Sequence, residues 1–152
     1  MTDITRKELN KILYLVTSET YLKAIIDATP TGETGNVSSA WDLKITDDEI
    51  IIYNDEFGDI VKYLESGTGL YGPKGKKYEI LPKNGKALAF MFPNATTPAN
   101  GKGGEHVFKG VMHPGIKARH FIEKVMEDKS VENEWNKMLY KELEKLVNSK
   151  LK

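Results

Sequence analysis

Three groups of residues are candidates for chemistry in this chain: its histidines, an acidic triplet and a glycine-rich stretch. The histidines are His106, His113 and His120. None of them makes the i, i+4 pair that the helix of a zinc protease presents. The chain has no cysteine, which excludes a thiolate zinc site and a disulfide. A metal would need carboxylates from distant parts of the chain, so we interpret His120 as a boundary residue and not as a ligand.

The acidic triplet Asp47-Asp48-Glu49 lies between two apolar runs. Carboxylates bind Mg²⁺ in nucleases, but consecutive acids at a hairpin tip point apart and into water. We therefore interpret the triplet as a turn. The Gly-x-Ser-x-Gly elbow of serine hydrolases is absent from the sequence. These observations predict that the protein is not an enzyme and has no catalytic, metal-binding or cofactor-binding residue and no cofactor.

The glycine-rich stretch contains a formal G-x-G-x-x-G at Gly67, Gly69 and Gly72. In a dinucleotide site this motif stands between a strand and a helix, so that the helix N-terminus meets the pyrophosphate. Here a helical pattern precedes the motif, and Pro73 and Gly75 follow it. We interpret the stretch as a loop that turns sharply, because glycine adopts backbone conformations that other residues avoid.

A β-hairpin is predicted before this loop. Trp41, Leu43 and Ile45 alternate with polar residues, which is typical of a half-buried strand. The second strand, Glu49–Tyr53, carries three consecutive isoleucines, which suit a pleated sheet. Trp41 is expected to pack in the core, because a large ring on an alternating strand usually faces inward.

A short helix is predicted over 56–66, from apolar residues at i, i+3, i+4 and i+7. Asn54 or Asp55 is a suitable N-cap, and Gly67 is expected to end the helix in a left-handed conformation. A first helix is predicted over 1–28, with Thr20 and Tyr21 loosening its middle.

Two further helices are predicted near the C-terminus. The first spans Ile116–Glu127, and Ser130 is the expected N-cap of the second. The last helix either closes over the sheet or docks on another subunit. We favour the first alternative, because a lone domain must cover its sheet face.

Two apolar runs, Lys86–Pro93 and Glu105–Met112, are predicted to be antiparallel strands, and Tyr78–Leu81 to add a short third one. Residues 94–104 between the runs are polar and glycine-rich. A long loop without periodicity inside a domain is usually functional or disordered. In a ring protein it would point into the lumen or reach a neighbour.

Together these elements predict a single α+β domain. Its small antiparallel sheet has four or five strands, packed by a long N-terminal helix and two C-terminal helices. The predicted parts are one domain over 1–152, the N-terminal helix in 1–28, a sheet region in 41–112 with the short helix 56–66, and the C-terminal helices in 116–150.

The 152 residues carry 22 basic and 22 acidic side chains, so the net charge is zero. The beginning of the chain is charged and no apolar run nears 18 residues, so we predict neither a signal peptide nor contact with a membrane. Charge is nevertheless uneven. Residues 42–65 hold eight acids against two lysines, and residues 74–109 hold seven lysines against two acids. These are either solvated surfaces or faces that meet across a repeated subunit contact.

Three segments of the chain resemble a tail-component family of long-tailed bacteriophages. The central one reads Y-N-D followed by I-V-K-Y-L-E-S-G-T-G, within Tyr53–Gly69. Upstream, P-T-G-E-T-G-N-V-S-S-A-W over Pro30–Trp41 is similar to the family's Pro-…-Thr-Gly-x-Leu-x-x-Ser segment, with Val37 in the Leu place. Downstream, H-P-G-I-K-A-R-H-F-I over His113–Ile122 is similar to its His-Pro-Gly-x-x-Ala-x-x-Phe segment. Order and spacing agree over roughly residues 5–127.

The resemblance implies a structural virion assembly protein of a siphovirus or prophage. Such proteins form rings, commonly hexamers, that complete the tail tube or join it to the head. The implied partners are further copies of the chain, the tail tube protein and neck or connector proteins, with non-specific contact with DNA in the lumen left open. The implied location is the virion tail or neck, and the host cytoplasm during assembly. The structural and assembly residues carried over are Trp41, Gly67, Gly69, Pro114, Gly115, Arg119 and Phe121.

The alternative is a small nucleotide- or nucleic-acid-binding accessory protein. The lysines of 74–109 lie among aromatic residues, as in single-strand-binding proteins. However, these aromatics fall on predicted core strands, and a zero net charge gives little sequence-independent affinity for DNA. We therefore favour the assembly protein.

Overall fold

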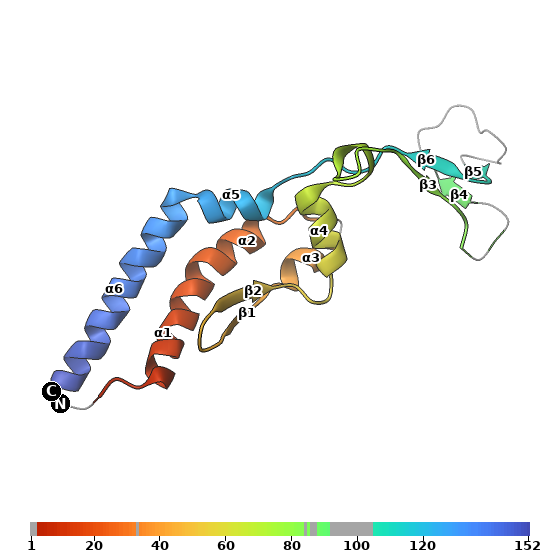
Figure 1. Ribbon diagram of the computed structural model, residues 1–152. Helices are drawn as coiled ribbons and strands as arrows, with labels where there is room; N and C mark the ends of the chain where they lie inside the picture. Colours follow the sequence, from red (N-terminus) through yellow and green to blue (C-terminus); the bar gives the residue numbers. More distant parts are fainter. Residues whose placement is uncertain (1–2, 33, 84, 86–87, 92–104) are drawn as a thin grey trace. The chain divides into compact units, whose positions relative to one another are not determined.

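A computed structural model describes residues 3–32, 34–83, 85, 88–91 and 105–152 (Figure 1). The chain divides into two compact units. Unit 1 comprises Met1–Glu65 and Arg119–Lys152, and unit 2 comprises Ser66–Ala118. Among the described residues, no helix combines the length and the apolar character that crossing a bilayer requires.

The predicted N-terminal helix is confirmed as three consecutive segments. They are α1 (Arg6–Thr17), a π turn η1 (Ser18–Leu22) and α2 (Lys23–Ala28). The π turn lies where loosening was predicted, and the Thr20 hydroxyl there donates to the carbonyl of Val16 at 2.7 Å. A side-chain bond to the i−4 carbonyl is a known cause of helix bending.

The predicted β-hairpin is also confirmed. A short helix α3 (Asn36–Ser39) leads into β1 (Asp42–Ile45), which pairs antiparallel with β2 (Ile50–Tyr53). The acidic triplet lies in the turn, as expected. Figure 1 shows α1 between this hairpin on one side and the last helix on the other.

The short helix α4 (Gly58–Ser66) follows the hairpin as predicted. The side-chain carbonyl of Asn54 accepts the N–H of Phe57 at 3.0 Å, and the Asn54 amide donates to the carbonyl of Val37 at 2.8 Å. Asn54 is buried. It thus fixes both the entry to α4 and the position of α3. Gly67 ends the helix with φ of +76°, as predicted.

The predicted helix over 116–127 is wrong in its first part, since α5 spans only Phe121–Glu127. The amides before it are bonded elsewhere: Ile116 donates to the Thr68 hydroxyl at 2.9 Å, and Arg119 to the carbonyl of Leu64 at 2.8 Å. These residues are therefore extended along neighbouring segments. The sequence pattern showed only that apolar residues here have helical spacing, and it did not show these hydrogen bonds.

The last helix, α6 (Lys129–Leu151), starts earlier than predicted. Its N-cap is Asp128 and not Ser130, because the Asp128 carboxylate accepts both the N–H and the hydroxyl of Ser130. The favoured expectation that α6 closes over the sheet is wrong. It packs instead along α1 and η1, where the indole N–H of Trp135 donates to the Thr17 hydroxyl at 3.0 Å.

The predicted sheet of four or five strands is contradicted, although the protein is α+β. In the described part of the chain the strands form three separate antiparallel pairs, β1–β2, β3–β6 and β4–β5. The strands of unit 2 are β3 (Tyr78–Ile80), β4 (Leu88–Met91), β5 (Glu105–Phe108) and β6 (Val111–His113).

The predicted strand over 105–112 is thus two strands. Lys109 and Gly110 interrupt it, and its halves pair with different partners, β5 with β4 and β6 with β3. A Cβ on Gly110 would lie 3.0 Å from the Leu81 side chain, so the backbone at this break passes close to Leu81. The pairs β3–β6 and β4–β5 follow one another along the chain as a two-stranded ribbon. Each described strand of this ribbon has a single hydrogen-bonded neighbour.

The hydrophobic core lies in unit 1. It is formed by side chains from α2, α4 and α5 and the residue before β1, namely Ile25, Trp41, Val61, Phe121 and Val125. Trp41 and Phe121 meet edge-to-face with ring centroids 6.4 Å apart. The Trp41 indole N–H donates to the Thr29 hydroxyl at 2.8 Å, which satisfies its polar atom inside the core. The prediction that Trp41 packs in the core is confirmed.

Candidate assembly surfaces

The seven predicted site residues fall into three places in the structure. Trp41 and Phe121 are in the core of unit 1, where they are buried and not exposed to a partner. Arg119 is exposed, just before α5. The other four, Gly67, Gly69, Pro114 and Gly115, lie together in unit 2.

The two loops of unit 2 that hold these four residues are in direct backbone contact. Thr68 donates its N–H to the carbonyl of Ile116 at 2.9 Å, and Leu70 donates to the carbonyl of Pro114 at 2.8 Å. Gly69 and Gly115 have φ of +61° and +101°. A Cβ on Gly115 would lie 1.9 Å from the Thr68 carbonyl oxygen, which no side chain tolerates. The loops approach so closely only because both positions are glycine.

The glycine loop does not present free amides to a phosphate at these positions. Besides Thr68 and Leu70, the N–H groups of Tyr71 and Gly72 donate to the carbonyls of Thr68 and Gly69. A phosphate cradle requires several amides that point into open space. The interpretation of the stretch as a structural loop agrees with this arrangement.

Glu65, His120 and Glu123 bring an imidazole and two carboxylates within 4.8 Å of one another. No signal in the sequence indicated Glu65 at this place, because it is far from His120 in the chain. Such a donor set resembles those that hold Zn²⁺. However, each Glu65 oxygen accepts a backbone N–H of α5, from Ile122 at 3.0 Å and Glu123 at 3.1 Å. The group is explained as a cap on the N-terminus of α5, where the helix dipole favours an anion and opposes a cation.

The histidines hold structural positions in the described part of the chain. His113 accepts the N–H of Gly115 on its Nδ1 at 2.9 Å, and its ring lies 5.3 Å from that of Tyr78. His120, with φ of +49°, contacts Glu123 at 3.1 Å through Nδ1. The side chain of His106 and the predicted loop 94–104 lie outside the described residues.

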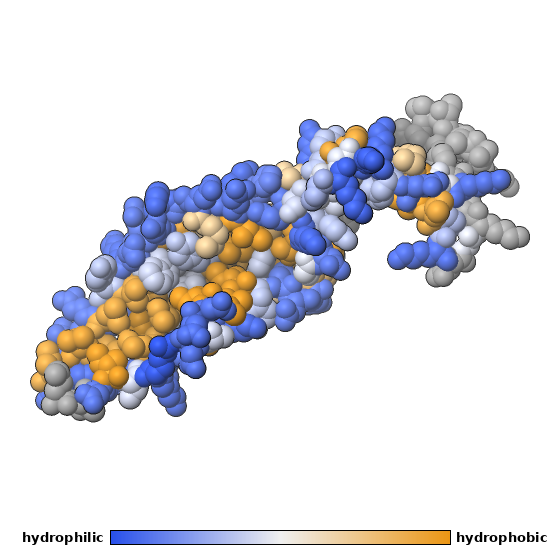
Figure 2. Space-filling view, viewed as in Figure 1, coloured by the Kyte–Doolittle hydropathy of each residue, from blue (hydrophilic) through white to orange (hydrophobic). Residues whose placement is uncertain are grey.

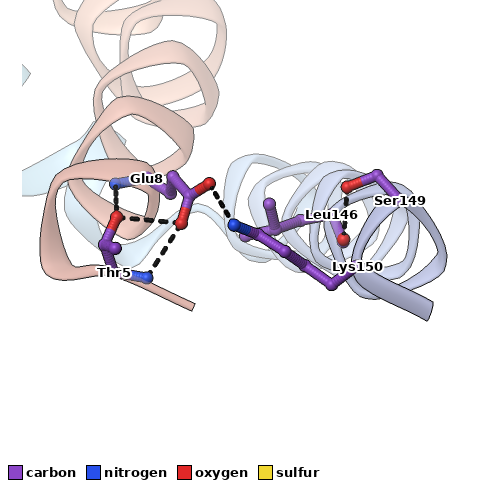
Figure 3. Close-up of polar contacts among 5 residues, drawn as sticks. All are labelled: Thr5, Glu8, Leu146, Ser149 and Lys150. Atoms are coloured by element: carbon purple, nitrogen blue, oxygen red, sulfur yellow. Dashed lines mark hydrogen bonds and ion pairs between the residues drawn. The ribbon is translucent and has the colours of Figure 1, made fainter. Parts of the chain in front are cut away.

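A groove between α1 and α6 was not foreseen from the sequence. It has a volume of about 200 Å³, and its lining is mostly leucine and isoleucine: Arg6, Leu9, Asn10, Ile12, Leu13, Leu139 and Leu143. At one end of the helix pair the Lys150 ammonium lies 2.7 Å from the Glu8 carboxylate (Figure 3). At the other end Trp135 bonds Thr17. Between these contacts, the leucines and the isoleucine that line the groove are only half-buried.

The Glu8 carboxylate is held by three donors. Besides Lys150, the backbone N–H and the hydroxyl of Thr5 donate to it, each at 2.8 Å (Figure 3). Lys150, followed by the Thr5 bonds, lowers the pKa of Glu8 to about 2. The carboxylate is therefore charged at neutral pH, and it joins the start of α1 to the end of α6.

A second hollow, which we call the lysine hollow, lies on the other flank of α1. It is shallow, with a volume of about 550 Å³, and α1 and β1 line it with Lys7, Asn10, Lys11, Tyr14, Lys44 and Ile45. Asn10 borders both hollows, and its side-chain oxygen is buried without a hydrogen-bond partner in the described structure. Figure 2 shows apolar surface over this side of unit 1, between α6 and the hairpin.

Apolar side chains are also exposed on α4 and α6. On α4, Ile60 and Tyr63 are 44% and 48% exposed. On α6, Tyr140 and Leu151 are 75% and 63% exposed, and this helix of 23 residues has no buried side chain. A stable monomer usually covers more of its long helices, because helix stability in water comes mainly from packing of an apolar face.

Comparison with protein-family models, with curated proteins and with solved structures found no match to this chain.

Proposed function

We propose that this chain is a structural assembly protein of a siphovirus or prophage, which forms a ring at the end of the tail and completes the tail tube or joins it to the head. The observation that carries the proposal is the exposed apolar surface of unit 1. Both hollows beside α1 and the outer faces of α4 and α6 leave large apolar side chains in water. Extended apolar surface of this kind is typical of protein–protein contacts.

The three segments that carry the phage-tail resemblance support the proposal because they contact one another. Asn54 of the central segment bonds Val37 of the upstream one. Trp41 packs on Phe121 of the downstream segment, and Gly69 of the central segment lies against Pro114. Within each unit, therefore, the segments that carry the resemblance are in contact with one another.

The ribbon of unit 2 gives a second line of support. A two-stranded ribbon in isolation is marginally stable, and its unpaired edges are templates for another strand. No hydrophobic side chain is buried among the unit 2 residues whose side chains are described, 66–83, 88 and 109–118, and Leu81 and Met112 are more than half exposed. Neighbouring copies, the tail tube protein or a neck protein would supply the missing contacts. A hexameric ring remains our proposal for the assembled state, with non-specific contact between its lumen and DNA left open.

Interruption of the gene in the phage or lysogen that encodes it tests this function. Electron microscopy of the lysate is expected to show separate heads and tails, or tails with unfinished ends. Supply of the intact chain in trans is expected to restore joined particles. Complete infectious virions in the absence of the protein would refute the proposal.

The alternative, a nucleic-acid-binding accessory protein, is favoured by one observation only. Lys7, Lys11 and Lys44 gather on a single hollow, and a cluster of lysines attracts phosphates. A gel shift with single- and double-stranded DNA at physiological salt tests it. Binding that depends on these three lysines would support the alternative.

A further inference from the structure

We propose that the outer face of α4 in one copy of the chain docks into the lysine hollow of a second copy. The inference deepens the proposed function and rests on it, since it names the contact through which copies assemble. Both surfaces belong to unit 1.

The lysine hollow is a cationic site with an apolar floor. Lys7 and Lys11 lie one turn apart on α1, and Lys44 approaches from β1. Tyr14, which is 45% exposed, and Ile45 provide the apolar surface between them. No carboxylate is among the described residues that line the hollow. Lys7 and Lys11 therefore face no carboxylate in the hollow, while the Lys44 ammonium lies 4.9 Å from the centroid of the Tyr53 ring, and an incoming anionic group is favoured.

The outer face of α4 has the complementary chemistry. Ile60 and Tyr63 lie one turn apart and are both nearly half exposed. Asp59 and Glu56 are exposed beside them. The one lysine of α4, Lys62, is two residues from Ile60 and so projects to roughly the opposite side of the helix. The face thus consists of two apolar side chains with acidic neighbours.

The two surfaces are opposite in charge, and both carry exposed apolar side chains. Apolar side chains of α4 would cover Tyr14 and Ile45, while its acids would meet the lysines at the edge. Charges at the edge of a contact mainly decide partner choice and association rate, and the apolar centre supplies affinity. The contact joins two different patches, so repetition around an axis produces a closed ring or an open filament. A ring is what the proposed function requires.

Charge reversal on each surface tests the inference. Lys7→Glu with Lys11→Glu reverses the hollow, and Glu56→Lys with Asp59→Lys reverses α4. Each pair alone is expected to weaken self-association by about tenfold or more, measured by sedimentation velocity at low salt over a concentration series. The quadruple variant is expected to recover most of the loss, because opposite charges face each other again.

The matched control is Lys23→Glu with Lys124→Glu. These lysines are also exposed, but they lie on α2 and α5, which neither line the lysine hollow nor belong to the outer faces of α4 and α6. The control is expected to leave self-association unchanged, and circular dichroism confirms that all variants fold.

Four results would overturn the inference. If the wild type associates and neither reversal matters, the contact is elsewhere while the proposed function stands. If the quadruple variant is no better than the pairs, α4 and the hollow do not meet. If the hollow reversal abolishes DNA binding and leaves association intact, the lysines serve nucleic acid. A wild type that never associates, in solution or on tails, would refute both the inference and the proposed function.

Discussion

Replacement of Gly115 by alanine is expected to separate the two loops of unit 2. The new Cβ would lie 1.9 Å from the Thr68 carbonyl oxygen, so one loop must move. The substitution also has a conformational cost, because alanine rarely adopts the φ of +101° that Gly115 has. That cost is about 1–2 kcal/mol, and overpacking adds about 1–3 kcal/mol. The loop contact should therefore weaken by about 2–5 kcal/mol in total.

Gly75 is the matched control for this variant. Its φ is +59°, but nothing lies within 4 Å of the position that its Cβ would take. Gly75→Ala therefore carries the conformational cost without the clash. The difference between the two variants in the free energy of loop opening therefore isolates the steric clash, which is about 1–3 kcal/mol.

Amide hydrogen exchange is the assay, because it reports local opening in unit 2 as well as global unfolding. The relevant amides are those of Thr68 and Leu70, which bond the opposite loop. They should exchange about 5 to 150 times faster in Gly115→Ala than in Gly75→Ala. Equal exchange rates in the two variants would refute the close backbone contact between the loops.

Three further predictions concern unit 1. The pKa of Glu8 is lowered from 4.5 to about 2, so its stabilising contact with Lys150 is present above pH 4.5 and is lost as pH falls toward 2. The difference in urea stability between wild type and Lys150→Met should therefore shrink over that range; a constant difference would contradict the ion pair. Trp41→Phe should lower the free energy of unfolding by about 1–3 kcal/mol, through a cavity and the lost bond to Thr29; a change below ~0.5 kcal/mol would argue against the core role. Glu65→Ala should cost about 1 kcal/mol as the cap of α5 is lost, with Glu65→Gln intermediate; wild-type stability in both would exclude the cap.

Local elements were predictable because their causes lie in adjacent residues. The β1–β2 hairpin follows from alternation around Leu43 and from the acidic turn. The end of α4 follows from Gly67. The π turn follows from Thr20, whose hydroxyl competes for a helix carbonyl.

Tertiary hydrogen bonds explain where prediction failed. The start of α5 was misplaced because Ile116 and Arg119 donate to segments about fifty residues away. The sheet was overestimated because an apolar run shows that a strand forms but not which strand it pairs with. Lys109 and Gly110 divide one such run between two partners.

The candidate site was only partly accessible from sequence. The glycines and Pro114 form a contact that their separate motifs did not indicate, and Phe121, carried over with Trp41 as an assembly residue, proved to pack on Trp41 in the core. The hollows beside α1 could not be predicted, because the sequence does not show which elements pack on each side of a helix. Lys7, Lys11 and Lys44 converge only through the pairing of α1 with β1, which no spacing in the sequence reveals.

The mass of the protein in solution, measured by light scattering over a dilution series, tests most directly whether copies of the chain cover its exposed surfaces. The account predicts one discrete assembly whose mass is a multiple of the 17.1 kDa chain and which dissociates when the lysine hollow is reversed. A mass of 17.1 kDa at every concentration, together with no association of copies on isolated tails, would contradict it.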